Sequence, residues 1–234
     1  MRTHALTRRA EPRQRQLTIF RRGRKRPGAG RKPTGDKPLV SHARREPVTR
    51  HTPVLVTVKL ERGLPSLRER AARQLVLEAL HAGKERLGMR VIHFSIQSNH
   101  LHAIVEASDA RSLSRAMKGL GVRLARRLNR MFHRAGRVFA DRYHAHVLRT
   151  PSEVRYALAY TLNNARKHGV RVEGIDRCSS GAAFDGWMER GARALARFID
   201  PPVVGAHSWL LRVGWRQHGL VSVTDVPSAP ARRP

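Results

Sequence analysis

The chain has 234 residues, of which 40% are hydrophobic, enough for one domain with a buried core and tails. Lys and Arg number 47 against 17 Asp and Glu, and the resulting formal net charge of +30 indicates a polyanionic partner such as nucleic acid. No apolar stretch approaches the about 20 residues that cross a bilayer, and the single cysteine, Cys178, excludes an internal disulfide. We therefore expect a cytoplasmic protein with no membrane partner.

The first fifty residues are rich in Lys and Arg, are punctuated by Pro and Gly, and show no sustained apolar period. Such a segment cannot offset its own ordering entropy, so residues 1–50 are expected to form a disordered, basic DNA-binding arm. Within it, RKRPGAGRKPTG (residues 24–35) resembles the Arg-Gly-Pro hooks that lie in AT-rich minor grooves, although a solvated linker has the same composition. The candidate DNA-binding residues of this arm are Arg24, Lys25, Arg26, Arg31 and Lys32.

Residues 51–88 predict a strand followed by a helix. HTPVLVTVKL (residues 51–60) has apolar residues at every second position, which is typical of a half-buried strand. After it, Ser66 and Glu69 have the spacing of a capping box, which predicts a helix that ends before Gly88. The expected core stripe of this helix is Leu67, Ala71, Leu75 and Ala79.

Residues 89–133 predict two antiparallel strands and a long helix. MRVIHFSIQ (residues 89–97) and HLHAIVEA (residues 100–107) both alternate, and a tight turn lies between them. From Ser108 to His133, apolar residues recur at steps of three and four, which predicts an amphipathic helix with a basic outer face. The candidate DNA-binding residues on that face are Arg123, Arg126, Arg127 and Arg130.

The next segments complete a recognisable order of elements. VFADRYHAHVL (residues 138–148) predicts a further strand, and Thr150, Pro151 and Glu153 give the cap, the first-turn proline and the capping-box glutamate of a helix that runs to about Gly169. The order predicts an α+β, ferredoxin-like fold, a split β-α-β arrangement with an antiparallel sheet, over residues 51–170. Residues 171–234 form a Gly-, Ser- and Pro-rich appendage with one apolar island, which either packs on the core or binds DNA.

Two groups of polar residues suggest a reactive site. His100 and His102 are two apart in a strand and so project from the same face, where two imidazoles could bind a metal that takes its third ligand from an oxygen atom. On the helix that follows, Tyr156, Tyr160, Asn164 and Lys167 form one stripe, opposite an apolar one. Read alone, the histidines also fit surface or nucleic-acid contacts, and so do His144 and His146, which alternate in the same way.

Taken together, these motifs resemble those of one family. SNHLHAIVEA resembles the N-H-V-H-hydrophobic strand, and YTLNNARKHGV the Y-x-x-x-N-x-x-x-x-G helix, of the single-tyrosine HUH transposases. The likeness is greatest to the REP-associated tyrosine transposases and covers His51 to Val170. The chain departs from many relatives at Ala165, where they have proline, and Tyr156 offers a rival nucleophile one turn before Tyr160.

The resemblance implies a mechanism. Tyr160 would be the nucleophile that becomes joined to a 5′-phosphate, and His100, His102 and Asn164 would hold a divalent metal, Mg²⁺ or Mn²⁺. Lys167, the basic helix and the arm would bind single-stranded or hairpin DNA in the nucleoid, as a monomer or homodimer. Two other functions remain open, a catalytically inactive nucleic-acid-binding module of the RNA-recognition type and a metal-dependent nuclease that uses water.

Overall fold

The computed structural model describes residues 46–195 and 202–226, which all belong to one compact unit. The candidate residues of the basic arm, Arg24, Lys25, Arg26, Arg31 and Lys32, lie outside the described residues. No helix in the described part of the chain is long and apolar enough to cross a membrane.

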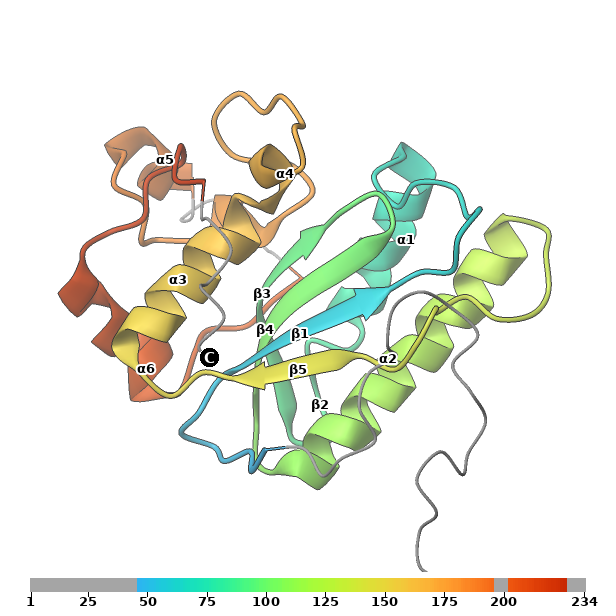
Figure 1. The fold of residues 1–234 in the computed structure, drawn as a ribbon, viewed down its shortest axis with the longest axis horizontal. Helices are drawn as coiled ribbons and strands as arrows, with labels where there is room; N and C mark the ends of the chain where they lie inside the picture. Colours follow the sequence, from blue (N-terminus) through green and yellow to red (C-terminus); the bar gives the residue numbers. More distant parts are fainter. Residues whose placement is uncertain (1–45, 196–201, 227–234) are drawn as a thin grey trace, which may run out of the picture. The chain divides into compact units, whose positions relative to one another are not determined.

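The centre of the fold is a five-stranded sheet in which every pair is antiparallel (Figure 1). The strand order is β2 (Glu85–Arg86), β3 (Met89–Ile96), β4 (His100–Ala107), β1 (Val54–Lys59) and β5 (His144–Val147). The first strand therefore lies between β4 and β5, as in a split β-α-β arrangement. The predicted α+β fold with its antiparallel sheet is confirmed, with the short β2 as an unpredicted addition.

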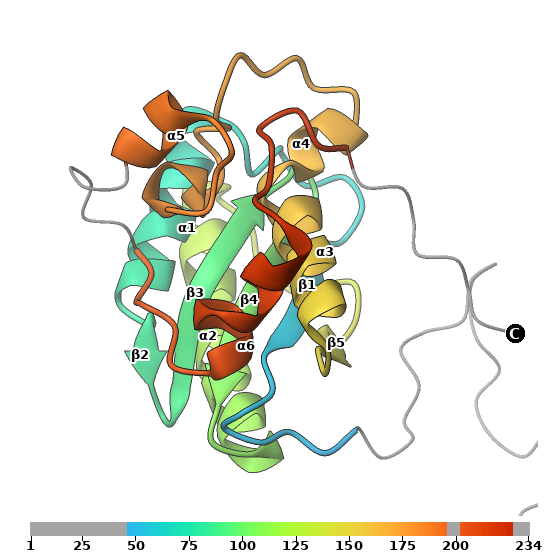
Figure 2. The same ribbon diagram turned by 90° about the vertical axis from the view of Figure 1, so that its left-hand side faces the viewer.

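Helices cover the two faces of the sheet. α1 (Arg70–His81) and α2 (Ala110–Met131) pack on the face that carries Leu101, Ala103 and Val105 of β4. α3 (Pro151–Leu162) packs on the opposite face, against Ile92 and Ile104. Figure 2 shows α1 and α3 on opposite sides of the sheet. Alternate residues of β4 therefore belong to two different apolar clusters.

The start of α1 differs from the prediction. The helix begins at Arg70, and no side chain caps it, so the capping box of Ser66 and Glu69 does not form. The backbone N–H of Leu67 instead donates to the carbonyl of Ser98 at 2.8 Å, in the turn between β3 and β4. This contact holds the segment as a turn against the sheet.

The core stripe of α1 is also displaced from the predicted one. Ala72, Val76, Ala79 and Leu80 are buried, whereas Ala71 is exposed and Leu75 is only partly buried. Uniform steps of four residues drift around a helix of about 3.6 residues per turn, whereas the buried residues keep one face toward α2 and the sheet.

The elements that follow α2 are shorter than predicted. β5 has four residues, and the upstream part of the predicted strand makes one isolated bridge, between Leu60 and Phe139. The capping box of Thr150 and Glu153 forms as predicted at the start of α3. α3 nevertheless ends at Leu162, and a separate turn of helix, α4 (Asn164–Lys167), follows a break at Asn163.

The segment after Gly169 packs on the core beside α3. It contains η1 (Ser180–Ala183), α5 (Arg190–Leu195), α6 (Trp209–Arg212) and η2 (Gly214–His218). Trp187 and Trp215 are each 1% exposed and belong to the cluster that α3 forms with the sheet. The carboxylate of Glu106 accepts the backbone N–H groups of His207 at 2.8 Å and Ser208 at 2.7 Å, which fixes the start of α6. The sequence left open whether this segment packs on the core or binds DNA, and the structure shows that its described residues pack on the core.

Candidate active site

The candidate site lies on the α3 side of the sheet, where β4 begins. His100 and His102 project from the same face of the strand, as predicted, and their ring centroids are 4.7 Å apart. His102 is 3% exposed and His100 is partly buried. The two imidazoles therefore meet at one point beneath α3 and α4.

Each imidazole has a polar partner at Nδ1. Nδ1 of His102 lies 2.9 Å from the hydroxyl of Thr57 on the neighbouring strand β1. Nδ1 of His100 lies 2.8 Å from the side-chain carbonyl of Asn99, in the turn before β4. Thr57 and Asn99 therefore fix the orientation of the two rings and leave the Nε2 atoms as the ones that can bind a metal.

Both histidines are held in their neutral form. Burial is the main cause that lowers the pKa of His100 to about 4, and the nearby charges of His168 and Lys59 add to it. Burial likewise lowers the pKa of His102 to about 3, with contributions from His100, His168 and Lys167. A neutral imidazole has a free lone pair, so both rings are ready to bind a cation at neutral pH.

Tyr160 faces the histidines from α3. Its hydroxyl lies 3.5 Å from Nε2 of His102, and the two rings are 5.1 Å apart. The ammonium of Lys167 lies 4.7 Å from the centre of the Tyr160 ring. This cation–π contact joins α4 to the tyrosine of α3.

The neighbouring Tyr156 stacks on Tyr160, with ring centroids 6.2 Å apart and planes inclined by 16°. Burial, and secondarily the charge of Tyr160, raises the pKa of Tyr156 above its ordinary value. Tyr156 is therefore harder to ionise than an ordinary tyrosine.

Asn164 completes the group, although it lies beyond the break in the helix. It is fully buried, and neither polar atom of its side chain has a hydrogen-bond partner. Its contact with His100 is close enough to oppose in part the lowering of that pKa, but falls short of hydrogen-bond geometry. A buried amide without partners is costly, so this side chain fits a site that is completed by a cation.

The donor set is an unusual one for a metal site. Among the described residues, no three His, Cys, Asp or Glu side chains gather in a way that could hold a metal. A site at this position would therefore rely on two imidazoles and an amide oxygen, and on oxygen atoms of a bound substrate.

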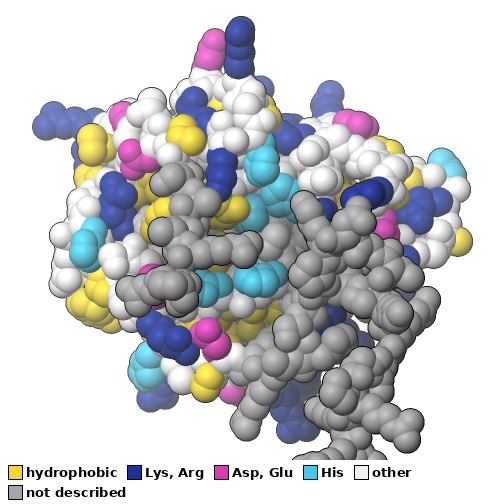
Figure 3. Space-filling model, viewed as in Figure 1, with side chains coloured by type: hydrophobic (Ala, Val, Ile, Leu, Met, Phe, Trp, Pro, Cys, Tyr) yellow, Lys and Arg dark blue, Asp and Glu magenta, His cyan; other side chains and the backbone are white. Residues whose placement is uncertain are grey.

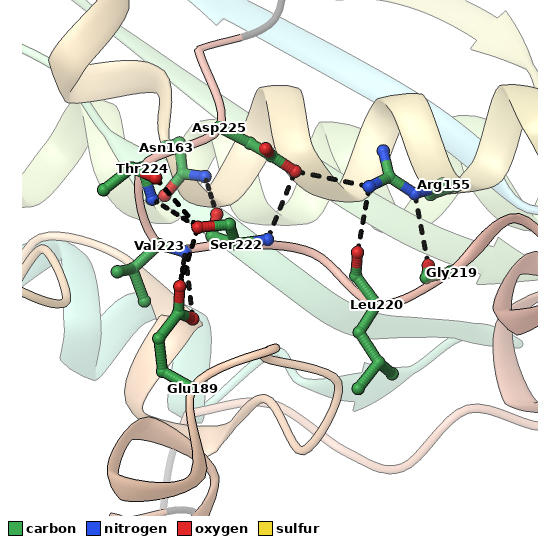
Figure 4. A network of polar contacts seen from close by, with 9 residues as sticks. All are labelled: Arg155, Asn163, Glu189, Gly219, Leu220, Ser222, Val223, Thr224 and Asp225. Carbon is green, nitrogen blue, oxygen red and sulfur yellow. Dashed lines mark hydrogen bonds and ion pairs between the residues drawn. The ribbon is translucent and has the colours of Figure 1, made fainter.

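A polar network holds α3 in place (Figure 4). Arg155 on this helix donates to the carbonyls of Gly219 at 3.1 Å and Leu220 at 2.9 Å, and forms an ion pair with Asp225 at 3.3 Å. At the end of the helix, the side-chain amide of Asn163 donates to the carbonyl of Ser222 at 2.9 Å. The C-terminal segment therefore braces the helix that carries Tyr160 at both of its ends.

The candidate DNA-binding residues of α2 lie away from this site. α2 packs on the sheet face opposite to His100 and His102. Arg123 donates to the carbonyl of Ala79, and Arg127 forms an ion pair with Glu78, so both contact α1. Arg126 and Arg130 are exposed. The structure thus brings Tyr160, His100, His102, Asn164 and Lys167 together, and separates them from the four arginines.

Three residues of the site were not predicted as site residues, although Asn99 is the first residue of the N-H-L-H motif. Thr57 and Asn99 hold the imidazoles, and the ring of His168 lies 5.2 Å from that of His100. The pairing register of β1 and β4 could have identified Thr57, because Thr57 lies directly opposite His102. His168 follows Asn164 by four residues and so continues its stripe.

The chain is similar in sequence and in fold to known transposases. Residues 54–160 match the family model of the IS200-like transposases. A solved REP-associated tyrosine transposase, bound to a REP hairpin, has a TM-score of 0.51 and 17% identity over 72% of this chain and 93% of its own. A solved putative transposase from Deinococcus radiodurans has a TM-score of 0.36 and 12% identity over 47% of this chain and 85% of its own. No curated protein is significantly similar to the chain.

The first of these solved structures shares the fold of this chain. The family match begins at the first residue of β1 and ends at Tyr160, and so includes both histidines and the tyrosine of the candidate site. Over residues 54–160, the chain therefore resembles the transposases of the IS200-like family.

Proposed function

We propose that this protein is a single-tyrosine transposase that cuts and rejoins single-stranded DNA, with Tyr160 as its nucleophile. The observation that carries the proposal is the convergence of the Tyr160 hydroxyl, the Nε2 atom of His102 and the unpartnered amide of Asn164. Attack by the phenol oxygen on a phosphodiester would form a 5′-phosphotyrosine bond and release a 3′-hydroxyl. Because one phosphodiester is exchanged for another, the same site can reverse the reaction onto a new 3′-hydroxyl.

The residues of the site fit a divalent metal. His100 and His102 would bind it through Nε2, and Asn164 through its side-chain oxygen, which would give that buried oxygen the partner it lacks. When bound, such an ion would polarise the scissile phosphate and offset the charge that develops on its oxygen atoms. Of the candidate ions, Mn²⁺ suits imidazole ligands better than Mg²⁺ does, and both are expected to support the reaction.

The other residues of the site have roles that do not depend on the ion. Lys167, above the ring of Tyr160, can contact the phosphate. Thr57 and Asn99 keep the imidazoles oriented, and the network around Arg155 and Asn163 keeps α3 in place. Tyr160 is preferred to Tyr156 because burial makes Tyr156 harder to ionise and because only Tyr160 faces His102.

The proposed substrate is a DNA hairpin with single-stranded flanks. The solved REP-associated transposase is bound to a REP hairpin, and the net charge of +30 provides the counter-charge for a nucleic acid. We assign the reaction to residues 51–170 and DNA contacts to the basic arm of residues 1–50.

The nuclease alternative is less well supported by the carboxylates of the site. A nuclease that activates water would be expected to place acidic side chains at its metal. Glu106 is on the same sheet face as His102, but backbone N–H groups of the C-terminal segment already occupy its carboxylate. A covalent intermediate separates the two reactions.

The test is the formation of a covalent adduct. Full-length protein is incubated with an end-labelled hairpin oligonucleotide that has single-stranded flanks, with Mn²⁺ or Mg²⁺, and is analysed on a denaturing gel. The proposal expects an adduct that Tyr160→Phe abolishes and Tyr156→Phe retains. His100→Ala and His102→Ala should also abolish it while DNA still binds.

The outcomes separate the alternatives. An adduct that persists in Tyr160→Phe would transfer the nucleophilic role to another residue. Cleavage without an adduct would favour a hydrolytic nuclease. Tight binding without cleavage, over a series of hairpins and both metals, would leave a binding module.

A further inference from the structure

The edge strand β5 carries a second pair of alternating histidines. His144 and His146 are both exposed, and neither belongs to the group around Tyr160. Figure 3 shows histidine side chains gathered over the middle of the face that the sheet presents in Figure 1.

The strand register places these histidines in line with the candidate site. Thr57 of β1 pairs with His102 on one side and with His144 on the other. Leu55, two residues earlier in β1, pairs with His146. Paired residues of antiparallel strands share a sheet face, so His144 and His146 lie on the same face as His102.

This part of the sheet face is open to solvent. α3 contacts the sheet through β3 and β4, and so covers the half of the face that lies away from β5. Lys59 on β1 is exposed and lies on the same face as Thr57, two residues away. We call the surface formed by Thr57, Lys59, His144 and His146 the β1–β5 strip.

The strip suits a polyanion. It contains one ammonium, two imidazoles and a hydroxyl, and none of its four residues is acidic. The one carboxylate of β4 on this face, that of Glu106, is buried and bound to backbone N–H groups. Among the described residues, no third His, Cys, Asp or Glu side chain joins these two histidines in a group that could hold a metal.

We propose that the β1–β5 strip binds the single-stranded DNA that flanks the scissile phosphate. Lys59 would contact phosphates, and the imidazoles of His144 and His146 would donate hydrogen bonds to phosphates and stack on bases. The strip begins at Thr57, which also contacts His102, so a strand that lies along it leads directly to the reactive tyrosine. The inference rests on the proposed function, because it assigns a position to part of that substrate.

The test measures binding by full-length protein that carries Tyr160→Phe, so that no adduct can form. Fluorescence anisotropy compares a hairpin oligonucleotide with single-stranded flanks and the same hairpin without them. His144→Ala together with His146→Ala should weaken binding of the flanked DNA about tenfold and leave the hairpin alone within about twofold. The matched control is His81→Ala together with His133→Ala, two exposed histidines at the ends of α1 and α2.

A crosslinking measurement locates the contact directly. With 4-thiothymidine placed in turn at each flanking position, crosslinked peptides should include His144 and His146. Equal loss of affinity for both oligonucleotides, no loss, or crosslinks confined to other elements would each overturn the inference. Failure of the proposed function is a separate result, because the wild-type protein would then form no adduct while the strip could still bind flanking DNA.

Discussion

The hydroxyl oxygen of Thr57 lies 2.9 Å from Nδ1 of His102, across the pairing of β1 and β4. If Nε2 is to bind a metal, the ring proton must be on Nδ1, and the hydroxyl oxygen of Thr57 is then its acceptor. The branched side chain of threonine has restricted rotation about its first torsion, so the acceptor is held in place. Thr57 thus orients His102 and can accept the Nδ1 proton that binding of a metal at Nε2 requires.

Replacing this acceptor should weaken metal binding without disturbing the fold. Thr57→Val keeps the shape of the side chain and removes the hydroxyl, and we expect an affinity for Mn²⁺ lower by about tenfold or more, as for other partners of metal-binding histidines. Thr57→Ser restores the oxygen and should bind nearly as the wild type does. Titration of free Mn²⁺ by electron paramagnetic resonance measures the affinity, and thermal unfolding of the metal-free variants checks the fold.

Asn164 should behave as a residue that destabilises the metal-free protein. Both polar atoms of its side chain are buried without partners, and such groups typically cost about 1–3 kcal/mol each. Asn164→Leu has a similar size and removes those atoms. We expect the metal-free variant to be at least as stable as the wild type, and to lose the rise in melting temperature that Mn²⁺ gives the wild type.

Asn164→Asp is the matched variant for this prediction. It keeps an oxygen ligand and should retain the metal-dependent rise in melting temperature, with a lower stability when metal is absent because the charge is buried. A leucine variant that is less stable than the wild type, yet still stabilised by Mn²⁺, would show that Asn164 supports packing and does not bind metal.

The sequence periods predicted most of the sheet and the helices, and tertiary contacts account for the differences. Alternating residues identified β1, β3 and β4, and the period of α2 was correct to within two residues at each end. The late start of α1 depends on the bond from Leu67 to Ser98, and the end of α3 on the bond from Asn163 to Ser222. Both bonds join residues that are far apart in the chain, so no local sequence pattern predicts them.

The site was predictable where it depended on a single element. The strand period alone puts His100 and His102 on the same face. Thr57 depends on the register between two strands, which the sequence left open. The basic face of α2 was also predicted correctly as an amphipathic pattern, but the period of a helix does not tell which face of the sheet it covers, and α2 covers the one away from Tyr160.

The contacts between α3 and the C-terminal segment of residues 219–225 should limit the mobility of this helix. Arg155→Met removes the bonds to Gly219 and Leu220 and the ion pair with Asp225. We expect faster amide hydrogen exchange in residues 219–226 and along α3, and a lower rate of DNA cleavage, because Tyr160 is then less well positioned. Arg216→Met breaks an exposed ion pair with Asp185 and is the control. Unchanged hydrogen exchange in α3 would show that the contacts of Arg155 do not limit the mobility of the helix.

Stability should fall as the pH is lowered, because three histidines resist protonation in the folded protein. The clearest is His93, which lies outside the site against Ser180 and Phe184. Burial lowers its pKa to about 4, and the charge of Asp185 opposes this only in part. The unfolded chain binds a proton near pH 6.5 and the folded chain does not, so stability is lost as the pH falls from about 6.5 toward 4.

Each such histidine should contribute up to about 1.4 kcal/mol per pH unit to that loss. His93→Gln should therefore flatten the dependence of the free energy of unfolding on pH by about this amount near pH 5, as measured by urea denaturation in the presence of a chelator. His144→Gln changes an exposed histidine and should leave the slope as it is in the wild type. If both variants kept the wild-type slope, His93 would take up its proton equally in the folded and unfolded chain, and its burial would not disfavour the charged form.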